Sequence, residues 1–436
     1  MKKIITRLIN KEKASATTLA KQIWELAEPG FCEYKSARLL AEYLDRAEFH
    51  VDFCFKNIPT AFKAISGRGK PIIGILGEYD ALPDCNPDKF AKNTYGHGCG
   101  HHLIGAGGAL TAVVLSTMLK QSNKKGTIVF LGCPAEELLA GKVYMARDGA
   151  FDGLDVCLEW HPGVKTYVDI HGGSALDSIA FEFYGITAHG AFAHAGRSAL
   201  DAAMLTDIAV NYLREHVPEQ VRIHGVVTEG GNAPNVVPAY ARLWYYVRAP
   251  DRKTVKEITK RVILCAKAGA IATETRVKVH YLTGVYERLP NVTLGKLLFK
   301  NLRLFGPLIP SPSEKKEIKR KGLDPEFDSR ISMSEKPSRA SNDADNVSWI
   351  TPLGYLSFGC VPKGTKGHHT SFVIQSNTTF AYRGMAHASA ILTATAWDLM
   401  VKPHLLQKVR KEFLEKTKKF QYDPLVPSTQ KPPVIT

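Results

Sequence analysis

Runs of apolar residues alternate with helix-length segments over the first 160 positions of the chain. The runs at 72–77, 127–133 and 154–160 have the length and continuity of strands that are buried on both faces. Between the first two runs, residues 103–119 form a segment of helical length that is rich in small apolar residues. Strands that alternate with helices predict an α/β domain with a mostly parallel sheet and covered faces.

Polar residues follow each of these three expected strands directly. Glu78 and Asp80 come after the first, Glu136 and Glu137 after the second, and His161 after the third. Ligands of open parallel sheets bind beyond the carboxyl ends of the strands. We therefore expect these side chains to share one site.

The middle of the chain has a different rhythm and predicts a second, smaller domain. Its elements follow the order β-α-β-β-α-β, the split βαβ unit of a ferredoxin-like layer. Strands are expected at 178–184, 222–228, 241–247 and 276–282, and helices at 199–216 and 254–270. The exposed edge of such a sheet needs covering, and pairing with a second copy is one simple way. The pattern thus predicts an inserted α+β lid or dimerisation domain at 176–287.

This insertion would divide the sheet domain into two parts, 1–175 and 288–436. Within the second part, residues 307–339 are rich in Pro, Ser, Lys and Glu and have little hydrophobic period. They predict a long surface insertion that is mobile or peripherally packed. The proline-rich tail after Tyr422 is expected to be extended and not catalytic.

Length and charge narrow the class of protein. A chain of 436 residues is long for a single core, and its formal charge is +15. Arginine-rich helices, aromatic stacking patterns and zinc-finger spacings are all missing from the sequence, so no nucleic-acid partner is expected. A solvated basic surface is the favoured interpretation, and a field that gathers anionic substrates is the alternative.

The chain gives no sign of a membrane or secretory protein. We find no unbroken apolar run long enough to span a bilayer, and residues 1–15 are basic without an apolar core. A cytoplasmic protein is therefore expected, and its eight cysteines, which lack a framework spacing, are expected to be thiols. Only Cys99 lies in a glycine-rich turn among histidines.

That turn supplies the first candidate metal ligands, Cys99 and His101. Thiolate, imidazole and carboxylate groups together suit a divalent transition metal, and an additional carboxylate suits metal-assisted hydrolysis. Taken alone, Cys99-Gly100-His101 is weak evidence. The turn leads into a helix, however, and its glycines let the backbone aim both side chains at one point. Spacing alone does not exclude His97 or His102.

The remaining candidates each have a simpler alternative. Glu136 and Glu137 could be a solvated acidic pair at a helix start, or they could divide the work, one binding metal and one moving protons. His161 could be a satisfied core histidine. One of His368 and His369 would complete the set of ligands.

Outside this set, Asp343 and Asp345 could orient ligand imidazoles or belong to a plain loop. In the lid, His189 and Asn235 could donate hydrogen bonds to a developing oxyanion, with simple turn architecture as the alternative. Arg248 could form a forked pair with a substrate carboxylate or a structural ion pair.

These motifs resemble the aminoacylase/hippurate hydrolase family of co-catalytic metallopeptidases, and most of all its aminobenzoyl-glutamate hydrolase and aminoacyl-dipeptidase branch. The matching segments are Gly77-Glu78-Tyr79-Asp80-Ala81-Leu82-Pro83, Gly96-His97-Gly98-Cys99-Gly100-His101, Gly132-Cys133-Pro134-Ala135-Glu136-Glu137, Trp160-His161-Pro162, Gly196–Ala202, Pro234–Pro238, Val247–Pro250, Asn346-Val347-Ser348-Trp349 and His369-Thr370. They extend over nearly the whole chain, and the combination is very specific.

The resemblance implies two divalent metal ions per subunit, Mn²⁺ or Zn²⁺, in the sheet domain. By motif position, Cys99 lies between the metals, and the other ligands are His101, Glu137, His161 and His369. Glu136 is then the general acid/base. The resemblance also implies that the lid mediates a homodimer and lends His189 to the site of the partner subunit.

Three departures from the family pattern flank this site. His102 stands where the family has Asn or Asp, Leu138-Leu139-Ala140-Gly141 largely replaces a glycine-rich run, and the segment 189–196 is one residue short. They put substrate preference in question more than metal binding.

The function expected from the sequence is a metal-dependent amidohydrolase. It would cleave N-acyl or N-aroyl amino acids or small dipeptides with a hydroxide held by the metals and Glu136 as proton carrier. Two alternatives stay open. One is an amide hydrolase with Cys99 as nucleophile, and the other is a non-catalytic binding or scaffold protein with the same fold.

Overall fold

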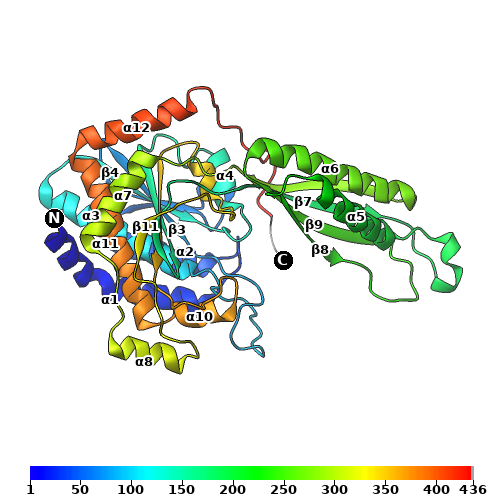
Figure 1. Ribbon diagram of the computed structural model, residues 1–436, viewed down its shortest axis with the longest axis horizontal. Coiled ribbons are helices and arrows are strands. Elements are labelled where there is room, and N and C mark those ends of the chain that lie inside the picture. Colours follow the sequence, from blue (N-terminus) through cyan, green and yellow to red (C-terminus); the bar gives the residue numbers. More distant parts are fainter. Residues whose placement is uncertain (434–436) are drawn as a thin grey trace.

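The computed structural model describes residues 1–433, and in that range the larger part of the molecule is built on an eight-stranded sheet (Figure 1). The order of its strands is β1-β2-β4-β3-β5-β12-β6-β11. They are β1 (His50–Phe53), β2 (Phe62–Arg68), β3 (Ile72–Glu78), β4 (Gly126–Cys133), β5 (Val156–Gly163), β6 (Thr166–Val168), β11 (Ile331–Met333) and β12 (Leu353–Gly359). The central strands β4, β3, β5 and β12 run parallel, while β1, β2 and the contact of β12 with β6 are antiparallel. The sheet is thus mostly parallel, as predicted.

Helices cover both faces of this sheet. The largest core cluster lies between the sheet and the long helices of one face, and a second cluster lies on the other face around α4. The helices of this domain are α1 (Lys2–Leu26), α2 (Tyr34–Arg46), α3 (His101–Ser122), α4 (Gly141–Arg147), α7 (Val292–Phe305), α8 (Pro312–Arg320), α9 (Ala344–Val347), α10 (Thr370–Ser376), α11 (Thr379–Val401) and α12 (Pro403–Thr417), with the short η1 (Phe55–Asn57). The parallel pairing of β3 with β4 and β5 places the carboxyl ends of all three strands at one edge.

Helix α3 corrects one expectation. In the described chain it is the one helix whose length and apolarity would suffice to cross a membrane, whereas no such segment was expected. However, 94% of its apolar window is buried inside the protein. Contacts with α1, α11 and β3 enclose the helix, as is typical of a core helix.

The predicted lid is a separate antiparallel sheet with two helices on one face. Its strands have the order β10-β7-β9-β8, and its helices pack on each other and on β9. The elements are β7 (Ala175–Tyr184), η2 (Gly190–Ala195), α5 (Ala199–Leu213), η3 (Arg214–His216), β8 (Arg222–Glu229), β9 (Tyr240–Ala249), α6 (Arg252–Ala272) and β10 (Arg276–Val285). The lid extends sideways from the sheet domain (Figure 1), and β7-α5-β8-β9-α6-β10 reproduces the predicted order.

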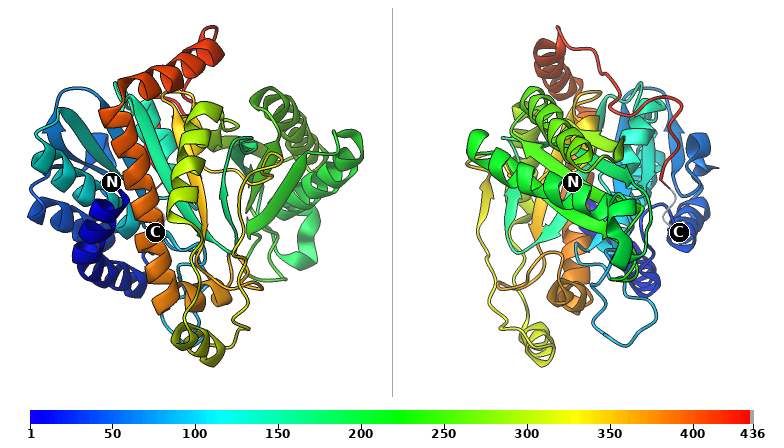
Figure 2. Two further views of the ribbon diagram at one scale, coloured as in Figure 1. Left: turned by 60° about the vertical axis from the view of Figure 1, so that its left-hand side comes forward. Right: turned by 90° about the vertical axis from the view of Figure 1, so that its right-hand side faces the viewer.

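The segment 307–339 contains more structure than its composition indicated. Ser311 and Glu314 form a capping box that starts α8, and Glu314 also pairs with Arg383 at 2.6 Å. Further on, β11 joins the central sheet by pairing with β6. Helix α8 lies at the periphery of the molecule (Figure 2), and the segment after it returns to the sheet edge.

Candidate active site

The candidate site lies at the carboxyl ends of β3, β4 and β5, where α3 begins. Gly100, with a φ of 80°, turns the chain between Cys99 and the first residue of α3, His101. A Cβ at this position would lie 2.8 Å from Pro162 and 2.9 Å from Phe372, so the turn requires glycine. The turn brings the thiol and the imidazole of the Cys-Gly-His motif to the same side.

A second close approach shapes the loop that carries the paired glutamates. A Cβ on Gly141 would lie 1.6 Å from the carbonyl oxygen of Pro134, so the loop folds back on itself only with glycine there. The buried carboxylate of Glu33 accepts a hydrogen bond of 2.7 Å from the N–H of Ala135. The loop thereby holds Glu136 and Glu137 at the edge of the sheet, despite the loss of the glycine-rich run.

Two sets of three metal-capable groups share the sulfur of Cys99. The ligand atoms of Cys99, His101 and His161 lie within 4.8 Å of one another, and so do those of Cys99, Glu137 and His368. A thiolate common to both sets could bridge two metal ions. Glu136 belongs to a third such group, with Glu78 and His101, directly beside the other two.

His101 is held in the orientation that a metal ligand needs. Its Nδ1 lies 2.8 Å from Oδ1 of Asp80, whose second oxygen accepts a hydrogen bond from the N–H of Glu137. The buried Nε2 has no hydrogen-bond partner among residues 1–433. A carboxylate behind one ring nitrogen and an orphaned second nitrogen are typical of ligating histidines. The donor set therefore fits a metal ion.

His161 is oriented in a similar way by its own backbone. Its Nδ1 lies 2.7 Å from the carbonyl oxygen of Pro162, which makes Nδ1 the donor. The other nitrogen, Nε2, lies 3.3 Å from the sulfur of Cys99. His161 is thus part of the cluster and not an isolated core histidine.

The structure brings His368, not His369, to the cluster. Nε2 of His368 lies 3.5 Å from Oε2 of Glu137, and its N–H donates to the carbonyl oxygen of Gly98. His369, the predicted ligand, caps α10 instead, because its Nδ1 accepts a hydrogen bond from the N–H of Ser371. A left-handed φ of 53° at His368 turns the two side chains apart.

Two other histidines of the motif are structural. His97 and His102 are buried, with ring centroids 4.9 Å apart and ring planes tilted by 53°. Their Nε2 atoms lie near the carbonyl oxygens of Ile23 and Ser376. Burial lowers the pKa of His97 to about 4, and both rings belong to the core behind the turn.

Burial also sets the electrostatics of the cluster. Burial raises the pKa of Glu137 to about 8, and nearby Asp80 and Glu78 add to the rise. The pKa of Glu136 is raised well above its usual range by burial and by the charges of Glu78 and Glu137. Burial likewise raises the pKa of the Cys99 thiol to about 12, which disfavours a free thiolate nucleophile. A divalent cation would relieve this crowding of negative charge.

A buried lysine beneath the cluster was not predicted. Nζ of Lys142 lies 2.5 Å from Oε1 of Glu78 and 2.5 Å from Oδ1 of Asp343, and all three side chains are fully buried. Burial alone would lower the pKa of Lys142, but Asp343 and Glu78 raise it well above its usual value. The sequence did contain one sign of a buried charge, because Lys142 is the single charged residue in the otherwise apolar stretch 138–146.

The sequence left open whether Asp343 and Asp345 orient ligand imidazoles. The structure shows that they do not. Asp343 binds Lys142, and Asp345 pairs with Arg288 at 2.6 Å. The carboxylate that orients His101 is Asp80 instead.

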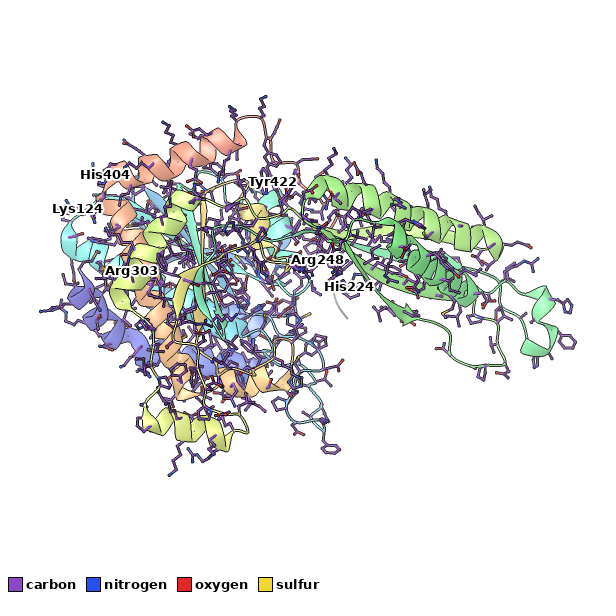
Figure 3. The ribbon with its side chains drawn as sticks, in the orientation of Figure 1. Lys124, His224, Arg248, Arg303, His404 and Tyr422 are labelled. Carbon is purple, nitrogen blue, oxygen red and sulfur yellow. The ribbon has the colours of Figure 1, made fainter. Side chains whose placement is uncertain are left out.

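A cleft of about 1370 Å³ opens over the cluster. Cys99, Glu136, Glu137, His161 and His368 line it on one side, and Arg248 from β9 and the segment 328–342 complete its walls. Figure 3 shows Arg248 where the lid meets the sheet domain.

Arg248 takes no part in a structural ion pair within the described chain. Its Nη1 donates to the carbonyl oxygen of Arg339 at 3.0 Å, and its Nε is buried without a partner among the described residues. The guanidinium is therefore anchored at one end and has hydrogen-bonding capacity left in the cleft.

His189 and Asn235 lie side by side in the lid but outside this cleft. The N–H of Gly190 donates to the carbonyl oxygen of Asn235 at 2.7 Å, and His189 pairs with Val236 in an isolated bridge. Both side chains are exposed, and neither is among the described residues that line the cleft. In the single chain they do not meet the cluster.

Comparison with known proteins agrees with this architecture. Residues 74–376 match peptidase family M20/M25/M40. The chain is 32% identical to a subunit of the p-aminobenzoyl-glutamate hydrolase of Escherichia coli (strain K12), over 99% of this chain and 98% of that protein. It is 29% identical to Xaa-Arg dipeptidase of Homo sapiens, over 93% and 90% of the two chains.

Solved structures show the same fold at low sequence identity. A putative aminohydrolase from methicillin-resistant Staphylococcus aureus superposes with a TM-score of 0.66 at 18% identity, over 92% of this chain and 100% of that one. YXEP of Bacillus subtilis, described as a dinuclear metal-binding peptidase of family M20, superposes with a TM-score of 0.57 at 18% identity, over 92% and 99%. From the match over 74–376 and the full-length similarity to its relatives, the chain belongs to peptidase family M20/M25/M40.

Proposed function

We propose that the chain is a metal-dependent amidohydrolase that binds two divalent ions and cleaves N-acyl or N-aroyl amino acids or small dipeptides. The observation that carries this proposal is the pair of three-donor sets that share Cys99. His101 and His161 would hold one ion, and Glu137 and His368 the other. Mixed thiolate, imidazole and carboxylate donors admit both Zn²⁺ and Mn²⁺.

Bound metal ions would supply Lewis acidity, which polarises the amide carbonyl and lowers the pKa of a water molecule. Glu136 is the proton carrier in this proposal because its carboxylate is buried beside the cluster, 3.6 Å from Nε2 of His101. It takes a proton from the attacking water and gives it to the leaving amine. The C–N bond breaks, and the acyl carbon gains the oxygen of water.

Arg248 is proposed to hold the free carboxylate of the amino acid that leaves. Its unpartnered Nε and its anchored Nη1 present a planar donor group to the cleft. A guanidinium of this kind fits a carboxylate with two parallel hydrogen bonds.

The lid is proposed to pair two copies of the chain. Strand β8 is an edge of the lid sheet, and it exposes Val226 and Val227. Helix α5 of the same domain exposes further large apolar side chains, Met204, Leu205, Ile208 and Tyr212. An open strand edge and an exposed apolar surface on one domain favour self-association. In such a homodimer, His189 and Asn235 would stabilise the oxyanion in the site of the partner subunit.

The first experiment measures metal content by elemental analysis together with hydrolysis of N-acyl amino acids and dipeptides, with and without chelator. We expect about two ions per chain and cleavage that the chelator abolishes. Cleavage that resists the chelator would favour Cys99 as a nucleophile. Bound metal without cleavage of any amide would favour the binding or scaffold alternative.

A further inference from the structure

The segment 328–342 forms one wall of the cleft and carries cations that nothing in the proposed mechanism uses. Lys336 and Arg339 lie on this segment, and Lys165 lies between β5 and β6 nearby in the lining. All three side chains are exposed, and none has an ion-pair partner within residues 1–433.

Other cations of the lining are neutralised. Arg288 pairs with Asp169 at 3.0 Å and with Asp345 at 2.6 Å. Arg330 pairs with Asp328 at 2.6 Å. Their charges are therefore already matched within the protein.

The carboxylates of the lining do not balance the remaining cations. Glu136 and Glu137 belong to the candidate metal cluster, and Asp169 and Asp328 are paired with arginines. In the described lining, four unpaired cations, Lys165, Arg248, Lys336 and Arg339, face one unpaired carboxylate, Glu335. Away from the cluster, the cleft is thus positively charged.

One substrate carboxylate on Arg248 would leave three of these cations unmatched. A second anionic group on the substrate would be attracted to the wall, whereas a guanidinium side chain would be placed among charges of its own sign. This difference separates the two kinds of substrate named for the relatives, a glutamate conjugate and a dipeptide that ends in arginine.

We infer that the amino acid released by this protein is acidic, and that Lys336 and Arg339 bind its side-chain carboxylate while Arg248 binds its α-carboxylate. The inference rests on the proposed function and adds the substrate class. The inference also gives the surface insertion 307–339 a role, because Lys336 and Arg339 lie at its carboxyl-terminal end.

The test compares four substrates that share one acyl group: N-benzoyl glutamate, glutamine, arginine and glycine. For the wild-type protein we expect kcat/KM for the glutamate substrate to exceed that for glutamine by about tenfold, with arginine lowest. In the double variant Lys336→Glu/Arg339→Glu, this preference for glutamate should disappear and the arginine substrate should gain. The glycine substrate keeps its α-carboxylate but lacks a side-chain carboxylate, so its kcat/KM should fall less than that of the glutamate substrate.

A matched control changes the same net charge on the same insertion but outside the cleft. Lys315 and Lys316 on α8 are exposed and are not part of the described lining, so Lys315→Glu/Lys316→Glu should keep the wild-type ranking. The contact of Arg248 with Arg339 uses a backbone carbonyl, so the substitution at Arg339 leaves that acceptor in place. Equal melting temperatures of the two double variants would exclude a difference in folding.

A binding measurement separates this inference from the proposed function. Calorimetry with free glutamate, glutamine and arginine on the metal-loaded protein requires no turnover. If no amide is cleaved but glutamate binds best and the cleft variant loses that preference, the specificity stands while the proposed activity fails. Equal use or binding of glutamate and glutamine by the wild type, or an unchanged ratio in the cleft variant, would overturn the inference.

Discussion

The edge of the central sheet that carries the candidate metal ligands and the tip of the lid are built in opposite ways. At the sheet edge, His101 and Glu136 are 1% and 6% exposed and are positioned by Asp80, Lys142 and the folded loop around them. In the lid, the side chains of His189 and Asn235 are exposed, and their contacts are local: Gly190 donates to the carbonyl oxygen of Asn235, and Nδ1 of His189 accepts from the N–H of Ala191. A dense cluster of buried charge must be held by hydrogen-bond and ion-pair partners, whereas exposed polar groups need no such support.

The largest effect is expected where the sheet edge depends on one buried charge. Lys142→Met leaves Glu78 and Asp343 buried without their common cation, which should lower the free energy of unfolding by about 3–5 kcal/mol. Urea unfolding of the metal-free protein measures it. Lys70→Met is the control, because Lys70 is 62% exposed and its pair with Asp155 should contribute less than about 1 kcal/mol. A loss of similar size in both variants would contradict a charge network specific to this edge.

The two adjacent histidines provide the next test. His368→Ala removes a donor beside Glu137, so affinity for one of the two ions should fall by more than about a hundredfold. His369→Ala removes only a helix cap, so metal binding should persist with a stability loss of about 1 kcal/mol. Calorimetric titration with Zn²⁺ or Mn²⁺ distinguishes the two. Loss of an ion in the His369 variant alone would restore the ligand assignment made from the sequence.

Glu136→Gln tests the proton carrier without changing the size of the side chain. Turnover should fall between about a hundredfold and ten-thousandfold while two ions stay bound. The measurement is kcat together with metal content. Near-normal turnover with full metal occupancy would remove Glu136 from the mechanism and leave the cluster to be explained by another proton acceptor.

The comparison also explains which features the sequence could predict. The strands β3, β4 and β5 end within three residues of their predicted positions, because each is a continuous apolar run. The strands β1, β2, β6, β11 and β12 were not expected. All but β12 lie toward the sheet margins, where short, partly exposed segments lack a clear hydrophobic pattern.

Within the site, the sequence identified residue types and failed on local geometry. Cys99, His101, Glu137 and His161 were predicted, and the structure brings them together. The choice between His368 and His369 depends on one left-handed backbone angle and one cap, which spacing does not encode. Lys142 pairs with Glu78, which is 64 residues away in the sequence, and with Asp343, which is 201 residues away. These pairs could not be inferred without the fold.

The proposed action of the lid residue His189 in the partner's site is tested by mixing two variants that are each expected to be impaired. His189→Ala should lower kcat on the order of a hundredfold, as does loss of one oxyanion donor in other hydrolases. If His189 acts in the partner's site, re-formed mixtures with Glu136→Gln should recover about a quarter of wild-type activity. Half of the randomly paired dimers then contain one complete site. No recovery, with mixed dimers verified by mass spectrometry, would mean that the lid histidine does not act across the interface.

The smallest expected effect is a change in the free energy of unfolding, at the point where the chain returns from the lid to the sheet domain. Glu412 on α12 accepts hydrogen bonds of 2.8 Å from the N–H groups of Val292 and Thr293, which begin α7. Burial alone would raise the pKa of Glu412, but the hydrogen bonds from Lys416 and from the start of α7 lower it to about 2.

A carboxylate whose pKa is lowered by folding stabilises the fold above its ordinary pKa of 4.5, and this contribution is lost as the pH falls toward 2. Glu412→Gln should therefore lower the free energy of unfolding by about 1 kcal/mol at pH 7. The deficit should shrink progressively below about pH 4.5. Urea unfolding between pH 7 and pH 3 measures it, with Glu415→Gln as a control, because the ion pair of Glu415 with Lys411 is long, at 3.9 Å, and exposed. A deficit that did not vary with pH would mean that shape, and not charge, anchors the return of the chain. The junction beside the lid would then differ from the sheet edge with the candidate metal ligands, where paired charges hold the arrangement.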